Sequence, residues 1–305
     1  MSPELSDTIF RCPESGAELE VSEAGFRAPS GKLWPRVRDI PRFVESDEYV
    51  ASFSFEWNTH TQTQLDSSNQ GLAKSAQILT EKTGLKPEDV KGKLVLDAGV
   101  GAGRFSEILA EWGANVVGVD LSYAVESAHA NLARFPNARV AQGDIFKLPF
   151  APETFDVIIS IGVLHHTPDT RKAFESLVPL LKPGGQICIW VYPREGDYII
   201  RDEWIPFTRR LPNQLFYRFC RRFVPLATRH AQNPLVRYVK GVFPFSQQGM
   251  GTENDILDTF DGFSPHFHGI HTPEEVQGWF RAQGLVEVDS QPVYRTAVRG
   301  EKLPA

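Results

Sequence analysis

The sequence predicts an α/β protein: a doubly wound, mostly parallel sheet with a helical cap inserted late in the chain and a small β segment at the N-terminus. Between residues 91 and 193, short apolar runs alternate with segments of helical spacing over short connections, which favours right-handed crossovers between parallel strands. Residues 194–262 interrupt this alternation, and the first 50 residues are punctuated by proline and glycine. A chain of 305 residues can bury a large core without disulfides.

Four parts follow from this order: residues 1–50 with short strands, the core at 51–193, the mostly helical cap at 194–262, and residues 263–305, which complete the sheet. A helix over 71–84, closed by Gly84, precedes the core strands. We expect core strands at 93–98, 115–120, 138–144, 155–161 and 186–192, a helix at 272–284, and a final strand pair at 285–291 and 294–300.

Composition narrows the classes of function. A net charge of −6 and a pI near 5.8 argue against a protein that binds nucleic acid over its whole surface. Cys12, Cys188 and Cys220 are too few and too scattered for a disulfide framework, which favours a reducing compartment. No apolar run reaches the roughly 18 residues of a membrane span, and the first residues do not resemble a signal peptide. We therefore expect a cytoplasmic protein without a membrane partner.

The stretch LVLDAGVGAGR at residues 94–104 places glycines directly after a buried strand. Gly99, Gly101 and Gly103 let the backbone take conformations closed to other residues and lie against a ligand. A helix follows, and its N-terminal N–H groups attract a nucleotide-type ligand. The nicotinamide and flavin fingerprint would need a glycine at position 104, which is Arg104.

Other strands of the core also end in residues suited to a ligand. The strand NVVGVD ends in Asp120, and the segment QGDIFKLPF places Asp144 after the next strand. A carboxylate at the tip that carries Asp120 can accept hydrogen bonds from ribose hydroxyls. Asp120 could instead cap the following helix, although Ser122 can take that role, and Asp144 could instead cap a turn.

Together these segments, with FDVIISIGVLHHTPD and LKPGGQICI, resemble the ordered motifs of class I S-adenosylmethionine-dependent methyltransferases, whose first motif is D-x-G-x-G-x-G. The resemblance covers residues 91–193 and implies a Rossmann-like fold with S-adenosyl-L-methionine as cofactor. Asp97 would order the glycine loop and approach the methionine amino group, and Trp57, with Phe55, would close over the donor. The resemblance assigns Asp144 to the adenine amino group. The cofactor-binding residues that it implies are Asp97, Gly99, Gly101, Gly103, Asp120, Leu121, Asp144, Ile145, Phe146, Ile161 and Trp57.

Two neighbouring histidines, His165 and His166, follow the fourth core strand, where open parallel sheets bind substrate. Methyl transfer is an in-line displacement, so a base is needed only when the acceptor must lose a proton. Histidine suits that task near neutral pH. His166 is the preferred catalytic candidate, but the same histidines can be structural, orienting the cofactor or capping a turn.

A second histidine cluster occurs in SPHFHGIHTPEE, with His266, His268 and His271. A metal site would need these side chains to converge with a carboxylate. The alternative, which we prefer, is an ordered loop that leads into a helix capped by Thr272 with Pro273 at its first position. We therefore expect no metal.

The cap is basic within an acidic protein and is interleaved with aromatic residues. Its arginines could simply be solvated. Alternatively, the cap forms a lid over a small apolar methyl acceptor with an anionic end, held by Arg221 or Arg222. An RNA methyltransferase and a non-catalytic protein that binds S-adenosylmethionine are the alternative functions. We expect a small-molecule partner rather than RNA. The acceptor atom, oxygen or carbon by preference, is not fixed by the sequence, and a homodimer stays open.

The N-terminal segment resembles the small zinc-ribbon domain of the activator of tRNA methyltransferases, in CPESGAEL and LWPRVRDIPRFV. Ser15 stands where the second cysteine of a C-P-x-C pair would be. With Cys12 alone, a tetrahedral zinc site cannot be assembled locally. We expect a metal-free remnant that packs on the main domain.

Overall fold

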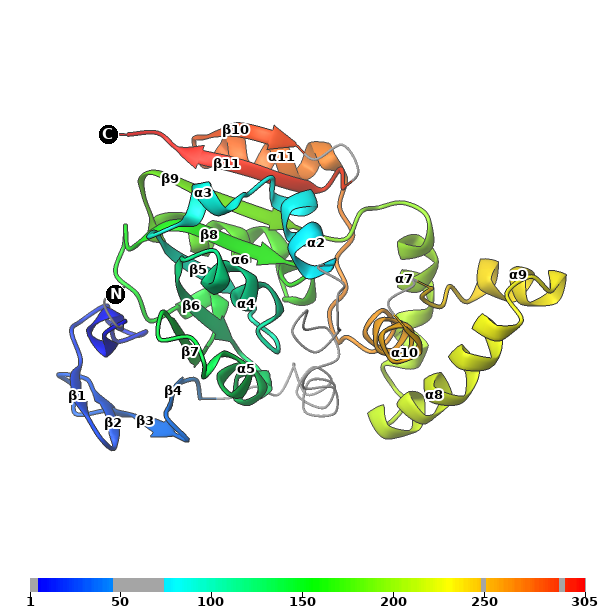
Figure 1. Ribbon diagram of the computed structural model, residues 1–305, viewed down its shortest axis with the longest axis horizontal. Coiled ribbons are helices and arrows are strands. Elements are labelled where there is room, and N and C mark those ends of the chain that lie inside the picture. The colour runs from blue at the N-terminus through cyan, green and yellow to red at the C-terminus, as the bar shows by residue number, and fades with distance from the viewer. Residues whose placement is uncertain (1–4, 46–73, 248–250, 291–293, 305) are drawn as a thin grey trace.

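The computed structural model describes residues 5–45, 74–247, 251–290 and 294–304. Its centre is a sheet in the order β1-β2-β3-β4-β7-β6-β5-β8-β9-β11-β10 (Figure 1). Strands β4, β7, β6, β5, β8 and β9 run parallel, and the hairpin of β10 and β11 adds two antiparallel strands beside β9. The predicted fold class is confirmed. The core strands are β5 (Leu94–Ala98), β6 (Asn115–Asp120), β7 (Ala138–Gly143), β8 (Phe155–Ile161) and β9 (Leu181–Trp190), followed by β10 (Leu285–Ser290) and β11 (Ala297–Lys302).

Helices cover both faces of the sheet, as its unbroken apolar strands require. On one face, α2 (Lys74–Thr83), α3 (Pro87–Val90), α4 (Arg104–Glu111) and α5 (Ala124–Leu132) enclose a core with Val95 and Val116. On the other face, α6 (Thr170–Leu177) and α11 (Pro273–Ala282) pack over Leu96 and Ile158. Short 3₁₀ turns η4 (Ile145–Lys147), η5 (Leu164–His166) and η6 (Val178–Leu180) complete the connections.

Two predicted strands have wrong boundaries. The last strand, expected at 294–300, is β11 at Ala297–Lys302, because residues 294–296 form a turn before it. We expected the fifth core strand at 186–192, but β9 begins at Leu181. Phe155 of β8 pairs with Leu181 of β9, and Val157 pairs with Gln186. The Lys182–Gly185 turn therefore forms a bulge in the pairing of these two strands. At its other end the strand stops at Trp190, and the chain leaves the sheet toward the cap.

The N-terminal segment extends the main sheet. It consists of η1 (Asp7–Ile9), β1 (Glu20–Ser22), β2 (Gly25–Arg27), β3 (Leu33–Val37) and β4 (Ile40–Phe43). Strand β4 pairs in parallel with β7, and Arg42 donates a hydrogen bond to Gln142 at 3.2 Å. The Phe10 ring lies 5.2 Å from Phe43 and 5.7 Å from Phe150. This aromatic cluster joins the segment to the core.

Residues 197–261 hold α7 (Asp197–Thr208), α8 (Asn213–Arg229), α9 (Pro234–Val242) and α10 (Thr252–Asp261), which stand apart from the sheet (Figure 1). They have a small core of their own, where Cys220 of α8, Phe260 of α10 and the loop residue Phe263 are fully buried. The Trp204 indole donates a 2.7 Å hydrogen bond to the Val242 carbonyl, which ties α7 to the end of α9.

Candidate functional site

A cavity of about 500 Å³ lies between the carboxyl ends of the core strands and the helices of the cap. The last residues of five strands line it: Ala98, Asp120, Gly143, Ile161 and Trp190. Parallel sheets place ligands at this edge because their connections open there. The glycine loop lies on one side of the cavity, and residues of α7 and α10 lie on the other.

The glycine loop curls tightly around the first strand tip. Gly99 has φ +95°, and a Cβ built there would lie 2.3 Å from the Val163 side chain. The Gly101 amide donates a hydrogen bond to Asp120 Oδ2 at 3.0 Å. Gly103, with φ +92°, is the N-cap of α4. Gly99 and Gly101 line the cavity, and Gly103 lies just outside its lining.

Asp120 is more engaged than the sequence suggests. Its Oδ1 accepts hydrogen bonds from the Ser122 amide at 2.9 Å and the Ser122 hydroxyl at 2.7 Å. Ser122 also accepts a hydrogen bond from the Ala124 amide at the start of α5. Ser122 thus takes the capping role, as expected, but Asp120 is held by protein hydrogen bonds as well as lining the cavity. Burial raises the pKa of Asp120, although these hydrogen bonds lower it.

Asp97 lies behind the glycine loop and does not line the cavity. Its Oδ2 accepts a hydrogen bond from the Ser106 hydroxyl at 2.7 Å, which fixes the loop against α4. Burial raises the pKa of Asp97 to about 7, although the hydrogen bond from Ser106 opposes this shift. The geometry joins Asp97 to the loop and gives it no direct face on the cavity.

The third strand tip is only partly turned toward the cavity. Gly143, Ile145 and Leu148 line it, whereas Asp144 and Phe146 do not. Asp144 caps η4, where its Oδ1 accepts the Phe146 amide at 3.0 Å. The turn-capping alternative for Asp144 is therefore realised. Leu121, after the second strand, also lines the cavity.

The two sequence-predicted histidines differ in position. His166 lines the cavity, and its Nδ1 lies 3.1 Å from the Phe267 carbonyl oxygen. A carbonyl can only accept, so Nδ1 carries the proton and Nε2 is the basic nitrogen. Burial lowers the pKa of His166 to about 4. His165 is fully buried against the Tyr192 ring at 3.7 Å and does not line the cavity.

Lys82 of α2 was not predicted, and it lines the cavity. Its Nζ is 3.2 Å from the centroid of the Trp190 ring and 5.1 Å from that of Tyr294. Burial lowers the pKa of Lys82 to about 7, with a further contribution from Arg104. Sequence offered little signal for it, because α2 precedes the motifs and only the fold brings it to β9.

The wall opposite the glycine loop mixes aromatic and charged groups, and it includes Tyr192, Tyr198, Arg201, Asp258 and Asp261. The Tyr192 and Tyr198 rings lie 4.6 Å apart and are tilted by 41°, and the guanidinium of Arg201 lies 5.7 Å from the Tyr198 ring. Among the described residues the buried Nε of Arg201 finds no hydrogen-bond acceptor. Burial, together with the neighbouring Asp261, raises the pKa of Asp258 to about 6.

Comparison with known proteins identifies the core. The sequence pattern of the methyltransferase domain family matches residues 96–189, the segment that carries the glycine loop and the strand tips. Residues 96–189 thus form a methyltransferase domain, and in this segment the chain is similar to class I S-adenosylmethionine-dependent methyltransferases. Residues beyond the domain, from α2, α7 and α10, supply the wall that faces it.

Similar proteins share only parts of the chain. Human "Probable tRNA methyltransferase 9B" is 33% identical over 135 residues, 42% of this chain and 28% of that protein. Ubiquinone biosynthesis O-methyltransferase of Coxiella burnetii is 39% identical over 101 residues, 32% of this chain and 43% of that enzyme. The chain thus spans less than half the length of these curated relatives.

One solved structure supports the fold over most of the chain. It is a complex of the Haloferax volcanii Trm112 methyltransferase activator with a methyltransferase, and it covers 86% of this chain and 99% of the matched one. The TM-score is 0.52 at 14% sequence identity. At that identity the likeness concerns the fold alone.

S-adenosylmethionine is the cofactor of the methyltransferase domain, and the residues at the strand tips fit it. Gly99 and Gly101 bring their backbone to the wall of the cavity, and position 99 needs glycine because a Cβ there would collide with Val163. Asp120 provides a carboxylate that lines the cavity at the second strand tip, and Leu121 and Ile145 provide apolar surface beside it.

Several other predicted residues lie outside this cavity. His268 lies 3.3 Å from Asp202, and His271 lies 3.6 Å from Glu275. Within the described ranges these side chains form no group able to hold a metal ion. Thr272 caps α11, with Pro273 at its first position, as expected. Trp57, Phe55 and the proposed closing segment lie outside the described residues.

The prediction that Arg221 or Arg222 holds an acceptor anion is wrong as to position. Both side chains are exposed on α8, and neither lines the cavity. The buried face of α8 is taken by Phe216, Cys220 and Val224, which turns the arginines outward. Arg201 of α7 reaches the cavity instead.

Proposed function

We propose that this protein transfers the methyl group of S-adenosylmethionine to an oxygen or carbon of a small, largely apolar metabolite that carries an anionic group. The observation that carries this proposal is one continuous cavity. Its glycine-loop side belongs to the methyltransferase domain, and its opposite side is lined by Trp190, Tyr192, Tyr198 and Tyr294. Ligand pockets of this size hold small molecules, with apolar walls and a few polar groups that fix orientation.

The cofactor supplies a methyl group on a sulfonium, and the protein must position the acceptor in line with it. The four aromatic side chains exclude water from the cavity. Holding the acceptor in line with the sulfonium lowers the activation barrier by up to roughly 7–11 kcal/mol. Arg201 is suited to the anionic group, because its buried Nε has an unused donor among the described residues. A guanidinium donates to a carboxylate or phosphate through fixed, forked geometry.

We propose Lys82 as the group that accepts a proton from the acceptor, ahead of His166. A catalytic base works best when its pKa is near the working pH. Lys82 has a pKa of about 7, whereas His166 has a pKa of about 4 and is a weak base. Both line the same cavity, and His166 Nε2 remains suited to hold an acceptor hydroxyl.

A methyl-transfer assay tests this proposal. Purified protein is given S-adenosylmethionine labelled in its methyl group and a panel of phenols and enols with and without a carboxylate or phosphate. We expect transfer to anionic members, with Arg201→Met raising KM at least tenfold and Arg222→Met, on the exposed face of α8, leaving it unchanged. Equal loss in both variants, or transfer only to neutral acceptors, would contradict the role of Arg201.

RNA is the second candidate substrate, because one relative is named a tRNA methyltransferase and the cap is basic. The same assay with bulk tRNA, at two salt concentrations, separates the two candidates. Labelling of tRNA that falls steeply with salt would favour RNA over a small acceptor. If S-adenosylmethionine binds but no acceptor is labelled, the non-catalytic alternative gains support. Cytoplasmic localisation stays a prediction.

A further inference from the structure

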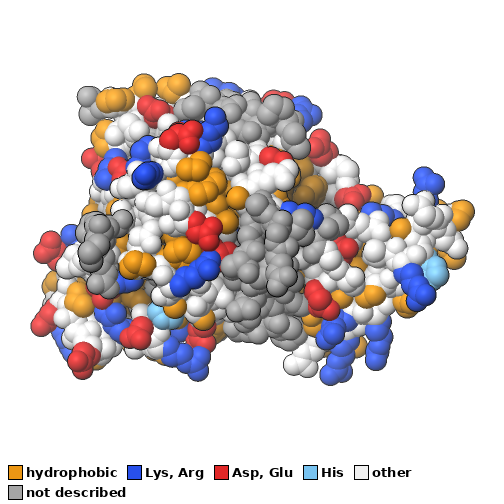
Figure 2. Space-filling view, in the orientation of Figure 1, with side chains coloured by type: hydrophobic (Ala, Val, Ile, Leu, Met, Phe, Trp, Pro, Cys, Tyr) orange, Lys and Arg blue, Asp and Glu red, His pale blue; other side chains and the backbone are white. Residues whose placement is uncertain are grey.

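The outer surface of α7, α8 and α9 carries large apolar side chains and arginines together. We call this surface the cap face. Figure 2 shows its far end, at the right, with hydrophobic and Lys or Arg side chains and no Asp or Glu. Contiguous apolar surface of this kind marks an interaction site on a folded protein. The cap face comprises the exposed residues Phe207, Arg209, Arg210, Leu211, Leu215, Arg218, Phe219, Arg221, Arg222, Leu226, Arg229, Leu235, Arg237, Tyr238 and Val242.

Helix α8 is apolar on two sides. One side, with Phe216, Cys220 and Val224, is buried in the core of the cap. The other side presents Leu215 and Leu226, and the Leu226 side chain is 61% exposed. A surface helix with a single apolar stripe would need only the first of these. The described residues of the cap leave this second stripe exposed.

Helix α9 has no fully buried residue, although its Val236 side chain packs, partly buried, against the core of the cap. Yet Leu235 is 69% exposed and Tyr238 is 72% exposed. A helix of nine residues is marginal in water without a packed apolar face. Its apolar side chains are therefore available to a partner that covers them.

A shallow groove, open to solvent, runs along the outer side of α8. Leu215, Phe219, Phe223 and Leu226 give it an apolar floor, and Arg218 and Arg222 flank it. This combination suits an alkyl chain that ends in an anionic headgroup. The groove is separate from the cofactor cavity, with which it shares no lining residue.

Charge is segregated onto the same surface. Residues 209–247 contain seven arginines and one lysine and no acidic residue. Removing these eight positive charges from a net charge of −6 leaves −14 on the rest of the chain. Within the described part of the chain, no carboxylate forms an ion pair with Arg218, Arg221 or Arg222. An anionic surface would attract the cap face and repel the remainder, which fixes one orientation.

We propose that the cap face docks on the surface of a membrane that contains anionic phospholipids. Helices that lie in a membrane interface combine exposed Leu and Phe with Arg and Lys, as α8 and α9 do. The phosphates of RNA would pair with the arginines, but RNA would not cover the aliphatic side chains of Leu226 and Leu235. A second copy of the chain would bring like charges together. The expectation of no membrane partner rested on the lack of a spanning segment, and the described helices indeed include none that could cross a membrane.

Sedimentation of the full chain with vesicles tests the proposal. Vesicles of phosphatidylcholine alone are compared with vesicles that also contain phosphatidylglycerol. We expect binding to the mixed vesicles only. The double variants Leu226→Ser/Leu235→Ser and Arg218→Glu/Arg222→Glu should each weaken binding at least about tenfold. The controls Leu303→Ser and Arg281→Glu change exposed residues elsewhere and should bind as the native protein does.

Circular dichroism melts of each variant establish that the fold is kept. Failure of the native protein to bind mixed vesicles would overturn the proposal. So would binding that the arginine variant loses and the leucine variant keeps, because that surface would act by charge alone. Salt-sensitive binding of RNA in place of vesicles, or a dimer in light scattering that the leucine variant abolishes, would assign the cap face to those partners instead. Because the readout is vesicle binding, it does not depend on the proposed methyl transfer.

Discussion

At the residue scale, Lys82 lies where the two sides of the cavity meet, against Trp190. With a pKa of about 7 its amine loses its charge as pH rises through neutrality. For an acceptor that must lose a proton, we predict that kcat rises with pH through about 7. Lys82→Met should remove this limb and lower kcat by roughly 10²–10⁴-fold.

The control for this prediction is Lys172→Met, which changes an exposed lysine of α6. A full pH profile of kcat for both variants separates loss of a base from loss of packing. If Lys82→Met keeps the native pH profile, Lys82 is not the proton acceptor, and His166 becomes the next candidate.

Asp97 gives a prediction about stability. Its pKa is about 7 in the folded protein because of burial, and 3.8 is the ordinary value expected when it is unfolded. The folded state therefore binds more protons between these values, and stability falls as pH rises through this window. Asp97→Asn has no charge to bury. At pH 8 its free energy of unfolding should therefore exceed that of the native protein by about 2–4 kcal/mol.

Urea titrations of the cofactor-free protein at pH 4.5 and pH 8 measure this difference. Near pH 4.5 the native Asp97 is mostly protonated in the folded state, so the gain of the variant should shrink toward zero. A gain that is equal at the two pH values would mean that the ionisation of Asp97 does not limit stability.

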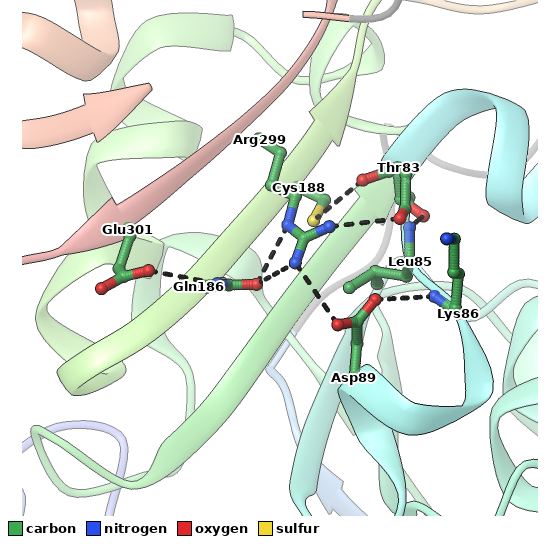
Figure 3. Close-up of polar contacts among 9 residues, drawn as sticks. Thr83, Leu85, Lys86, Asp89, Gln186, Cys188, Arg299 and Glu301 are labelled. Atoms are coloured by element: carbon green, nitrogen blue, oxygen red, sulfur yellow. Dashed lines mark hydrogen bonds and ion pairs between the residues drawn. The ribbon is translucent and has the colours of Figure 1, made fainter. Parts of the chain in front are cut away.

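At the element scale, Arg299 of β11 ties the C-terminal hairpin to the segment after α2 (Figure 3). It donates to Gln186 of β9 at 2.6 Å and to the Gly84 carbonyl at 3.2 Å, and it lies 3.9 Å from Asp89 of α3. This network holds the end of α2, which carries Lys82. The hairpin of β10 and β11 thus helps to hold Lys82 at the cavity.

Arg299→Leu should lower the free energy of unfolding by about 2–3 kcal/mol, because it leaves these acceptors without a charged donor. Arg299→Lys keeps the charge but loses the forked geometry, so we expect an intermediate loss. Urea denaturation measures both, with Arg295→Leu at an exposed neighbouring position as the control. Equal stability of Arg299→Leu and the control would contradict the structural role.

Some elements could be predicted from sequence and others could not. Residues 94–98 and 115–120 are apolar runs followed by turn residues, so local pattern suffices to identify β5 and β6. The glycine loop and Asp120 follow from the same pattern. Lys82 and Arg201 carry no local signal, because Lys82 reaches the cavity only when α2 packs against β9 and Arg201 only when α7 of the cap lies over the strand tips. Asp97 was placed correctly in the strand, but its contact with Ser106 depends on the packing of α4.

At the scale of the whole molecule, one continuous sheet joins the N-terminal segment, the methyltransferase domain and the C-terminal hairpin, and the cap stands beside its carboxyl edge. The segment expected to be a remnant packed on the core adds β4 to the edge at β7, close to the loop that carries Ile145. The cap contributes Arg201 and Asp258 to the cavity and turns its basic face outward. The cavity and the cap face are therefore separate parts of one fold.

The central claim is that the strand tips bind the donor, and calorimetric titration with S-adenosylhomocysteine tests it most directly. The native protein should bind, and Asp120→Ala should weaken binding by about 1.5–3 kcal/mol, because it removes a charged hydrogen-bond acceptor from the second strand tip. Asp169→Ala, at the exposed N-cap of α6, is the control and should bind as the native protein does. Absence of binding by the native protein, or unchanged affinity in Asp120→Ala, would contradict the account.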